Sequence, residues 1–357
     1  MHPAIADAPA TRDERLLRAL AQAIGLLPQG VRRRLAIDRD VRENGVQLES
    51  RTAALVGLAS RTGRSFCDEL EVSTARADSR MLNRAFRPLE PRPVEVGAVR
   101  IPVDGGALDA RSYRPKELRG AAPLIVYFHG GGFVTGDLEG YDGLMRSIAA
   151  AGNVAVLAVD YRLGPEERFP RAHEDGFAAF AWAQRAVREL CVDPRRIAVA
   201  GDSAGGGIAA AVGAFASERG LATPAYQLLI YPAVDATGAT PSRRRFTRGV
   251  PLTPGLIAWF VRHYARSPDD LRLPLFAPLR ADSLAASPPT YLLAAGFDPL
   301  VDEGRLYVER LCAEGVRATY DLRPALAHGF VNLAGVVPDA RRALVHAVAV
   351  TAASLRS

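Results

Sequence analysis

Apolar segments of strand length alternate with longer helical segments over most of the chain after residue 120. The strand-like runs are residues 124–128, 154–159, 197–200, 228–231, 291–294 and 318–322. Apolar strands that alternate with helices are typical of a parallel sheet covered by helices on both faces. The pair 99–103 and 108–113, joined across Gly105 and Gly106, instead indicates an antiparallel hairpin at the sheet edge. The sequence therefore predicts an α/β fold with a mostly parallel, twisted sheet.

The rest of the chain divides into an N-terminal region and an insertion. Residues 1–92 are polar and helical in pattern, with Leu16, Leu20 and Ile24 at helical spacing, and a proline-rich stretch follows them. Residues 93–357 form the α/β domain. Within it, more than 50 residues separate Pro232 from Pro289, which is too long for a plain strand-to-helix connection. We expect an inserted cap at about 233–288, with a helix near 253–265.

The net charge of +6 does not by itself indicate a nucleic-acid partner. Of the 45 basic residues, Lys116 is the only lysine, so the excess is almost wholly arginine. Phosphate-binding surfaces usually mix lysine and arginine, and a uniform arginine bias indicates a compositional habit. The runs 32–34 and 243–245 are candidate basic patches, but such runs are more often solvated helix or loop surface. We expect no nucleic-acid partner.

The cysteines and the apolar segments indicate a cytoplasmic protein. Cys67, Cys191 and Cys312 are widely spaced and form no C-x-x-C pair, which fits a reducing compartment and argues against a disulfide framework or a zinc site. The first residues contain no apolar signal sequence, and the longest nearly uncharged stretch, 204–216, is too short for a membrane span. We expect neither a metal nor stable membrane insertion.

Ser203 lies in the sequence Gly-Asp-Ser-Ala-Gly at 201–205, a G-x-S-x-G pattern. The pattern directly follows the apolar run 197–200 and precedes a helix of small residues. This is the context of a nucleophile elbow, in which a strand turns sharply into a helix and exposes a serine at the apex. The alternative is a glycine-rich turn without function. The strand and helix around it favour the nucleophile hypothesis.

Three consecutive glycines, Gly130 to Gly132, follow His129 at the end of the run 124–128. Glycine lets backbone N–H groups approach a substrate oxygen closely, so this loop and the N–H of Ala204 could hold the oxyanion formed when Ser203 attacks. A flexible loop or a phosphate loop is the alternative, but no Gly-Lys-Ser or Gly-Lys-Thr occurs in the chain. We expect His129 to orient the loop.

A serine nucleophile of this fold is followed along the chain by an acid and then by a histidine. Three histidines follow Ser203: His263 in the expected cap helix, His346 in a C-terminal helix, and His328 in a loop beyond the strand 318–322. Only a loop position can reach over the sheet edge, which favours His328. Asp298 directly follows the strand 291–294 and is the candidate acid.

Two other acids compete with Asp298. Asp302 and Glu303 follow within the next predicted helix, where acidic residues also stabilise a helix N-terminus. Aromatic residues around the expected site are Phe133, Trp259, Phe260 and Tyr264. They could line a substrate pocket or pack the cap onto the sheet, and the pattern leaves both interpretations open.

These motifs together resemble the hormone-sensitive-lipase-like family of serine esterases. The resemblance covers about residue 93 to the C-terminus and rests on His-Gly-Gly-Gly at 129–132, Gly-Asp-Ser-Ala-Gly-Gly at 201–206, Asp-Pro-Leu-x-Asp-Glu at 298–303 and His-Gly-Phe at 328–330, with Asp-Tyr-Arg-Leu-Gly-Pro-Glu at 160–166. It implies an α/β-hydrolase fold without a cofactor. It also implies a triad of Ser203, Asp298 and His328.

The resemblance further implies oxyanion donors at Gly131, Gly132 and Ala204. In relatives the N-terminal helices join the mid-chain insertion to form the cap, and residues 1–45 look like an extension. Gly164 stands where alanine is more usual, and residues 167–168 also depart from the pattern, away from the chemistry.

The expected function is hydrolysis of short- to medium-chain acyl esters through an acyl-enzyme, with a small-molecule ester as the partner. An amidase, lactonase or carbamate hydrolase could use the same triad. A non-catalytic small-ligand receptor on this scaffold is the alternative from another class, and the presence of His328 argues against it. Substrate identity and a homodimer stay open.

Overall fold

The computed structural model describes residues 9–36, 42–61, 70–90 and 92–357. Cys67 lies outside the described residues, whereas Cys191 and Cys312 are exposed free thiols. Within the described part of the chain, no helix combines the length and the hydropathy needed to cross a membrane.

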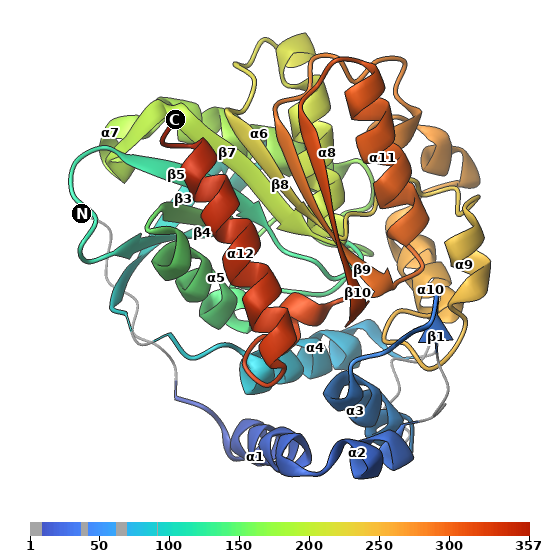
Figure 1. The fold of residues 1–357 in the computed structure, drawn as a ribbon. Helices are drawn as coiled ribbons and strands as arrows, with labels where there is room; N and C mark the ends of the chain where they lie inside the picture. The colour runs from blue at the N-terminus through green and yellow to red at the C-terminus, as the bar shows by residue number, and fades with distance from the viewer. Residues whose placement is uncertain (1–8, 37–41, 62–69, 91) are drawn as a thin grey trace.

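An eight-stranded sheet forms the centre of the molecule (Figure 1). Its strands are β3 (Val94–Val103), β4 (Gly106–Pro115), β5 (Ala122–Phe128), β6 (Ala155–Val159), β7 (Val192–Asp202), β8 (Tyr226–Ile230), β9 (Thr290–Phe297) and β10 (Ala318–Ala327). Their order across the sheet is β10-β9-β8-β7-β5-β6-β4-β3. Strands β5 to β10 pair in parallel, and β4 pairs antiparallel with β3 and β6. The prediction of a mostly parallel sheet with an edge hairpin is confirmed.

Helices cover both faces of the sheet (Figure 1). One face carries α6 (Arg171–Arg185), α8 (Ala204–Phe215) and α11 (Val301–Ala313), and the other carries α5 (Leu138–Gly152) and α12 (Pro338–Ser354). Leu124, Val126 and Phe128 of β5 belong to the core on the α8 side. Ile125 and Tyr127 belong to the core on the α12 side. Because successive strand residues point to opposite faces, an apolar run of this kind fits a strand buried on both sides.

Two helices of the α/β domain are each followed by a shorter helix. The helical segment between β6 and β7 is split at Ala186 into α6 and the short α7 (Val187–Leu190), which Cys191 ends in the left-handed conformation at φ +53°. The helix of small residues after Ser203 is α8, followed by the 3-10 helix η1 (Ser217–Arg219), which Gly220 ends at φ +71°.

The N-terminal region packs along the carboxyl-terminal end of the sheet. It contains α1 (Arg12–Leu26), α2 (Gln29–Leu35), β1 (Arg42–Glu43), β2 (Val46–Gln47), α3 (Ser50–Arg61) and α4 (Val72–Phe86). The Glu49 N–H donates to Ala325 O at 2.8 Å, and Arg76 Nε donates to Val134 O at 2.9 Å. These bonds fasten the region to the last residues of β10 and to the loop that follows β5.

The hairpin β1–β2 was not among the predicted elements of this region, where we expected helices alone. Its turn is Asn44-Gly45, with φ of +50° and +79°. Asn-Gly is the strongest short hairpin signal because both residues tolerate positive φ. The expectation of helices alone was therefore wrong, although the Asn44-Gly45 pair already indicated a hairpin.

The segment 233–288 contains α9 (Pro241–Arg245), α10 (Pro254–Tyr264) and the 3-10 helices η2 (Pro268–Arg272) and η3 (Pro278–Arg280). Helix α10 corresponds to the helix predicted near 253–265. Its start follows from the sequence, because the Thr253 side chain accepts from Leu256 N at 3.3 Å and Pro254 occupies the first turn.

Candidate active site

Ser203 connects the end of β7 to the start of α8 and has φ +54° and ψ −120°, a conformation that non-glycine residues rarely adopt. The residues two positions before and two positions after Ser203 must be glycine, because other backbone atoms lie close to them. A Cβ atom at Gly201 would lie 2.3 Å from Gly205 O, and one at Gly205 would lie 2.1 Å from Phe128 O. The strained serine therefore sits on the sharp strand-to-helix turn that the sequence predicted.

His328 lies between Ser203 and Asp298. Its Nε2 atom is 2.8 Å from Ser203 Oγ, and its Nδ1 atom is 2.8 Å from Asp298 Oδ2. Asp298 is fully buried, and its Oδ1 atom accepts from Leu300 N at 2.8 Å. The Tyr231 ring lies beside the imidazole at a centroid distance of 4.6 Å. The structure thus brings the three predicted residues into one hydrogen-bonded chain.

The parallel sheet accounts for this meeting of distant residues. Ser203 follows β7, Asp298 follows β9 and His328 follows β10, and these strands run in one direction. Because the carboxyl ends of parallel strands meet at the same sheet edge, residues 125 positions apart can touch.

The competing acids contact the insertion instead of the imidazole. The Asp302 side chain accepts from Ser242 N at 2.8 Å. Glu303 accepts from Val234 N at 3.0 Å and pairs with Arg243 at 2.8 Å. Burial raises the pKa of Glu303 to about 7. Both acids thus hold the insertion against the first turn of α11.

The two other candidate histidines lie in the predicted helices, away from the serine. His263 belongs to α10, and its Nδ1 atom is 2.8 Å from Trp259 O. His346 belongs to α12, where its ring faces Tyr291 at a centroid distance of 6.4 Å. Neither has a contact with Ser203 among the described residues.

The glycine loop after β5 lies beside the serine turn. Phe128 pairs with Gly201 at the end of the parallel β5–β7 ladder, so both strands reach the same edge together. Gly131 has φ +124° and Gly132 has φ +61°. Among the described groups, none accepts from the backbone N–H of Gly131, Gly132 or Ala204. These donors are therefore unpaired beside a candidate nucleophile.

Asp202 joins the serine turn to the glycine loop. The buried carboxylate accepts from Gly130 N at 2.9 Å and Tyr127 OH at 2.9 Å through Oδ1, and from Tyr141 OH at 3.0 Å through Oδ2. Burial raises its pKa to about 6. Sequence analysis assigned this residue no role, although an acid at the end of an apolar strand was a usable signal.

His129 is held within the loop and does not face Ser203. Its Nδ1 atom is 2.8 Å from Gly130 O, and its ring stacks on Tyr161 at a centroid distance of 4.4 Å. Burial lowers the pKa of this imidazole. The neutral ring is therefore a packing element that shapes the loop.

The insertion reaches the glycine loop through α10. Of the four aromatic residues considered above, Phe133, Trp259 and Tyr264 are buried, and Phe133 stacks on Tyr264 at 4.4 Å. Phe260 is half-buried, and a Cβ atom at Gly132 would lie 2.1 Å from its Cγ atom. Three of the aromatics thus pack the insertion onto the sheet, and Phe260 covers the loop.

The segment that follows β6 also binds the C-terminal end of α10. Phe169 N donates to Tyr264 O at 2.9 Å, and Arg168 Nη1 donates to Ala265 O at 2.7 Å. A Cβ atom at Gly164 would lie 2.7 Å from His263 O. The glycine that departs from the family pattern therefore permits a close approach of α10.

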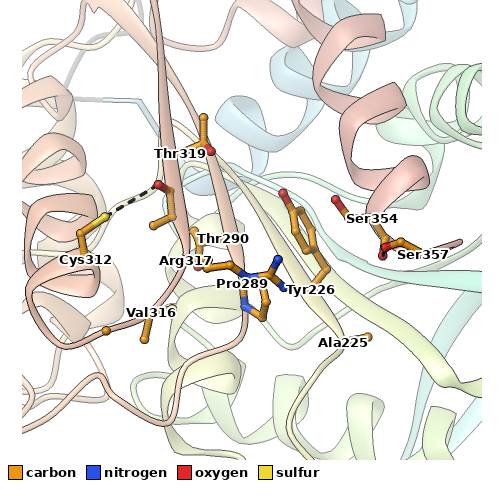
Figure 2. Close-up of a pocket in the computed structure, with 12 residues that line it drawn as sticks. Ala225, Tyr226, Pro289, Thr290, Cys312, Val316, Arg317, Thr319, Ser354 and Ser357 are labelled. Atoms are coloured by element: carbon orange, nitrogen blue, oxygen red, sulfur yellow. Dashed lines mark hydrogen bonds between the residues drawn. The ribbon is translucent and has the colours of Figure 1, made fainter.

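A separate pocket of about 540 Å³ lies at the amino-terminal ends of the strands, opposite the end that carries Ser203 (Figure 2). Tyr226 and Thr290, the first residues of β8 and β9, line it together with Arg317. Cys312 also lines it, and its thiol donates to Ala318 O at 3.7 Å. Because this pocket surrounds the amino ends of the strands, it is distinct from the site around Ser203.

The sequence is similar to an alpha/beta hydrolase family and to individual ester hydrolases. The model of the alpha/beta hydrolase fold family matches residues 125–332. The chain is 39% identical over 317 residues to the carboxylic ester hydrolase LipN of Mycobacterium tuberculosis, covering 86% of this chain and 83% of LipN. It is 38% identical over 250 residues to an ethyl acetate hydrolase of Pseudomonas putida, covering 69% of this chain and 78% of that protein.

Solved structures give the same result. An ester hydrolase from the metagenome of Lake Arreo, bound to a derivative of bipyridine phosphonate, has a TM-score of 0.84 and 35% identity, covering 87% of this chain and 100% of that one. An esterase of Pyrobaculum calidifontis has a TM-score of 0.77 and 38% identity, covering 83% and 97% of the two chains.

Proposed function

The chain belongs to the alpha/beta hydrolase fold family, in its hormone-sensitive-lipase-like branch of ester hydrolases, and on this premise we propose that Ser203, His328 and Asp298 form its catalytic triad. The observation that carries the proposal is the hydrogen-bonded chain from Ser203 Oγ through His328 to Asp298, with both steps at 2.8 Å. The proposed reaction is hydrolysis of short- to medium-chain acyl esters of small molecules.

In the proposed first half-reaction, Ser203 Oγ attacks the ester carbonyl carbon while His328 Nε2 takes the hydroxyl proton. The imidazolium that forms is stabilised by the carboxylate of Asp298, which also fixes the tautomer. When the tetrahedral intermediate collapses, the ester C–O bond breaks and His328 gives its proton to the leaving alcohol. The acyl group remains on Ser203.

The oxyanion of that intermediate would be bound by the N–H groups of Gly131, Gly132 and Ala204. What supports this assignment is their location at the loop and at the N-terminus of α8, without acceptors among the described groups. Each such donor stabilises the transition state by about 3–4 kcal/mol in comparable enzymes. Water activated by His328 then attacks the acyl-enzyme and releases the acid.

We propose that the N-terminal helices and the insertion at about 233–288 together form a cap over the site. Contacts of α4 and α10 with the loops after β5 and β6 support this division, for example Arg76 Nη2 to Gly164 O at 2.8 Å. The position of Phe260 against Gly132 supports a preference for short and medium acyl chains, because its ring occupies space beside the oxyanion loop.

Each basic run contains at least one arginine with an internal partner, which supports the expectation of no nucleic-acid ligand. Arg243 pairs with Glu303, and Arg245 pairs with Glu43 at 2.8 Å. Arg32 donates to the carbonyl oxygens of Gly25 and Leu27. The cytoplasmic location stays a prediction from the sequence.

Hydrolysis of chromogenic esters from C2 to C16 tests the proposed function. We expect wild type to prefer the shorter members and Ser203→Ala to lose hydrolysis of every ester. Full activity in Ser203→Ala would refute the nucleophile assignment. Matched anilides and lactones measure the amidase and lactonase alternatives, and faster turnover of either class than of the esters would replace the proposed reaction.

A further inference from the structure

Helix α1 carries apolar side chains on its buried side and also on its exposed side. Ala21 and Ile24 of its inner face are buried against the protein. On the outer face, Leu16 is 58% exposed, Leu20 is 50% exposed and Leu26 is 88% exposed. Leu16 and Leu20 lie one helical turn apart, so they form a continuous stripe. Leu26 is the last residue of α1 and the most exposed leucine among the described residues. Helix α1 thus carries three exposed leucines.

The outer face is solvent-exposed although α1 is firmly attached. The helix begins with a capping box in which Thr11 and Glu14 bond reciprocally. Glu14 is buried and pairs with Arg84 of α4 at 2.7 Å. Arg18 Nη1 donates to Ala85 O at 3.2 Å and Arg87 O at 2.9 Å. These bonds fix the rotation of α1, and its leucines face outward as a consequence.

Basic residues occur in the same two helices as the exposed apolar residues. Arg12 and Arg15 lie in the first turn of α1, and Arg33 and Arg34 lie in α2 beside the exposed Val31. Between residues 11 and 36, all of which the structure describes, the acidic residues are Asp13 and Glu14, and Glu14 is already paired with Arg84. The surface therefore combines exposed apolar side chains with an excess of positive charge.

This combination fits an anionic lipid surface better than a second copy of the chain. Two copies joined through these leucines would bring arginines close to arginines, which costs free energy. A bilayer with anionic headgroups receives the leucines at its interface and neutralises the arginines. Figure 1 shows α1 and α2 as the outermost helices at the end of the molecule that also carries α3 and α4.

We propose that the outer face of α1 and α2, defined by Leu16, Leu20, Leu26 and Val31 with the four arginines named above, docks the protein reversibly on membranes that contain anionic phospholipids. Docking of this kind needs no spanning segment. It also does not depend on the esterase reaction, because none of these residues belongs to the site around Ser203.

Sedimentation of the full-length protein with vesicles tests the proposal. We expect binding to phosphatidylcholine vesicles that contain phosphatidylglycerol, weaker binding as salt is raised, and little binding to pure phosphatidylcholine. Changing Leu16, Leu20 and Leu26 together to serine should weaken binding at least ~10-fold. Arg12→Gln with Arg15→Gln should weaken it about fivefold for each arginine.

A matched control uses leucines that are exposed elsewhere. Leu306→Ser with Leu322→Ser should leave vesicle binding unchanged, and circular dichroism should show the wild-type fold for all variants. Absence of wild-type binding at low salt, equal binding to neutral vesicles, or equal loss in the control pair would each overturn the proposal. A wild-type dimer in light scattering that the α1 leucine variant converts to a monomer would identify a second copy as the occupant and overturn it as well.

Discussion

The Oδ2 atom of Asp298 lies 2.8 Å from the Nδ1 atom of His328, although 30 residues separate the two in the chain. Asp298 follows β9 and His328 follows β10, and these neighbouring strands pair in parallel. Leu300 N occupies the other carboxylate oxygen at 2.8 Å. The carboxylate is therefore fixed in the orientation that directs one oxygen at the imidazole.

The first prediction separates the candidate acids. Asp298→Asn should lower kcat about 10⁴-fold, because an amide beside Nδ1 favours the wrong imidazole tautomer. Asp302→Asn is the matched control, since that side chain bonds to Ser242 N, and its kcat should stay near wild type. Steady-state kinetics on one short ester decides between them. A comparable loss in Asp302→Asn alone would transfer the acid role to that residue.

The second prediction concerns the glycine loop. Gly132→Ala should lower kcat about 100-fold or more, because φ is +61° and the new Cβ atom would collide with Phe260, displacing an oxyanion donor. Gly238→Ala provides the control: φ is +68° there, but no atom lies within 4 Å of the added Cβ. It should cost ~1 kcal/mol of stability and leave kcat unchanged. Equal kcat for wild type and Gly132→Ala would remove Gly132 from the proposed donors.

The third prediction concerns pH and Asp202. Because burial raises its pKa from 3.8 to about 6, the folded protein binds this proton more tightly than the unfolded chain. The group therefore lowers the free energy of unfolding as pH rises from about 4 to 6, by on the order of 3 kcal/mol. Asp202→Asn removes this titration, so urea unfolding at pH 4.5 and 7.5 should differ less in the variant. The same pH dependence of unfolding in both proteins would refute the raised pKa of Asp202 as its cause.

The fourth prediction concerns the buried carboxylate of Glu303. Arg243→Met should lower the free energy of unfolding by about 3 kcal/mol, because it leaves a buried carboxylate without its cation. Burial raises the pKa of Glu303 to about 7, so the carboxyl is neutral in the folded protein at pH 5 and ionised at pH 8.5. The loss should therefore be larger at pH 8.5. Arg244 is exposed, so Arg244→Met is the control. An equal loss of unfolding free energy in Arg244→Met would show that the Arg243–Glu303 pair is not the cause.

The sheet and the convergence of Ser203, His328 and Asp298 were accessible from the sequence because each depends on local signals. Apolar runs between helical segments located the strands, and the parallel direction of β7, β9 and β10 placed the residues after them at one edge. The choice between Asp298 and Asp302 rested on one consideration only, whether the acid directly follows a strand. The structure brings Asp298 to His328 and directs Asp302 to Ser242.

Contacts between distant segments could not be predicted in the same way. The three donors to Asp202 come from β5, α5 and the glycine loop, and no spacing rule relates them. The position of Phe260 on Gly132 depends on how the insertion folds back over the loop. The exposed leucine stripe of α1 also required the structure, because the sequence pattern alone does not say which apolar face is buried.

Covalent labelling with a fluorophosphonate tests the central claim, that Ser203 is the activated nucleophile, most directly. The serine oxygen displaces fluoride and forms a P–O bond, and peptide mass spectrometry locates the adduct. We expect one adduct per chain, on Ser203, with esterase activity lost in proportion to labelling and with no labelling of His328→Ala. Complete labelling of Ser203 with full activity retained, or inactivation with the adduct on another residue, would contradict it.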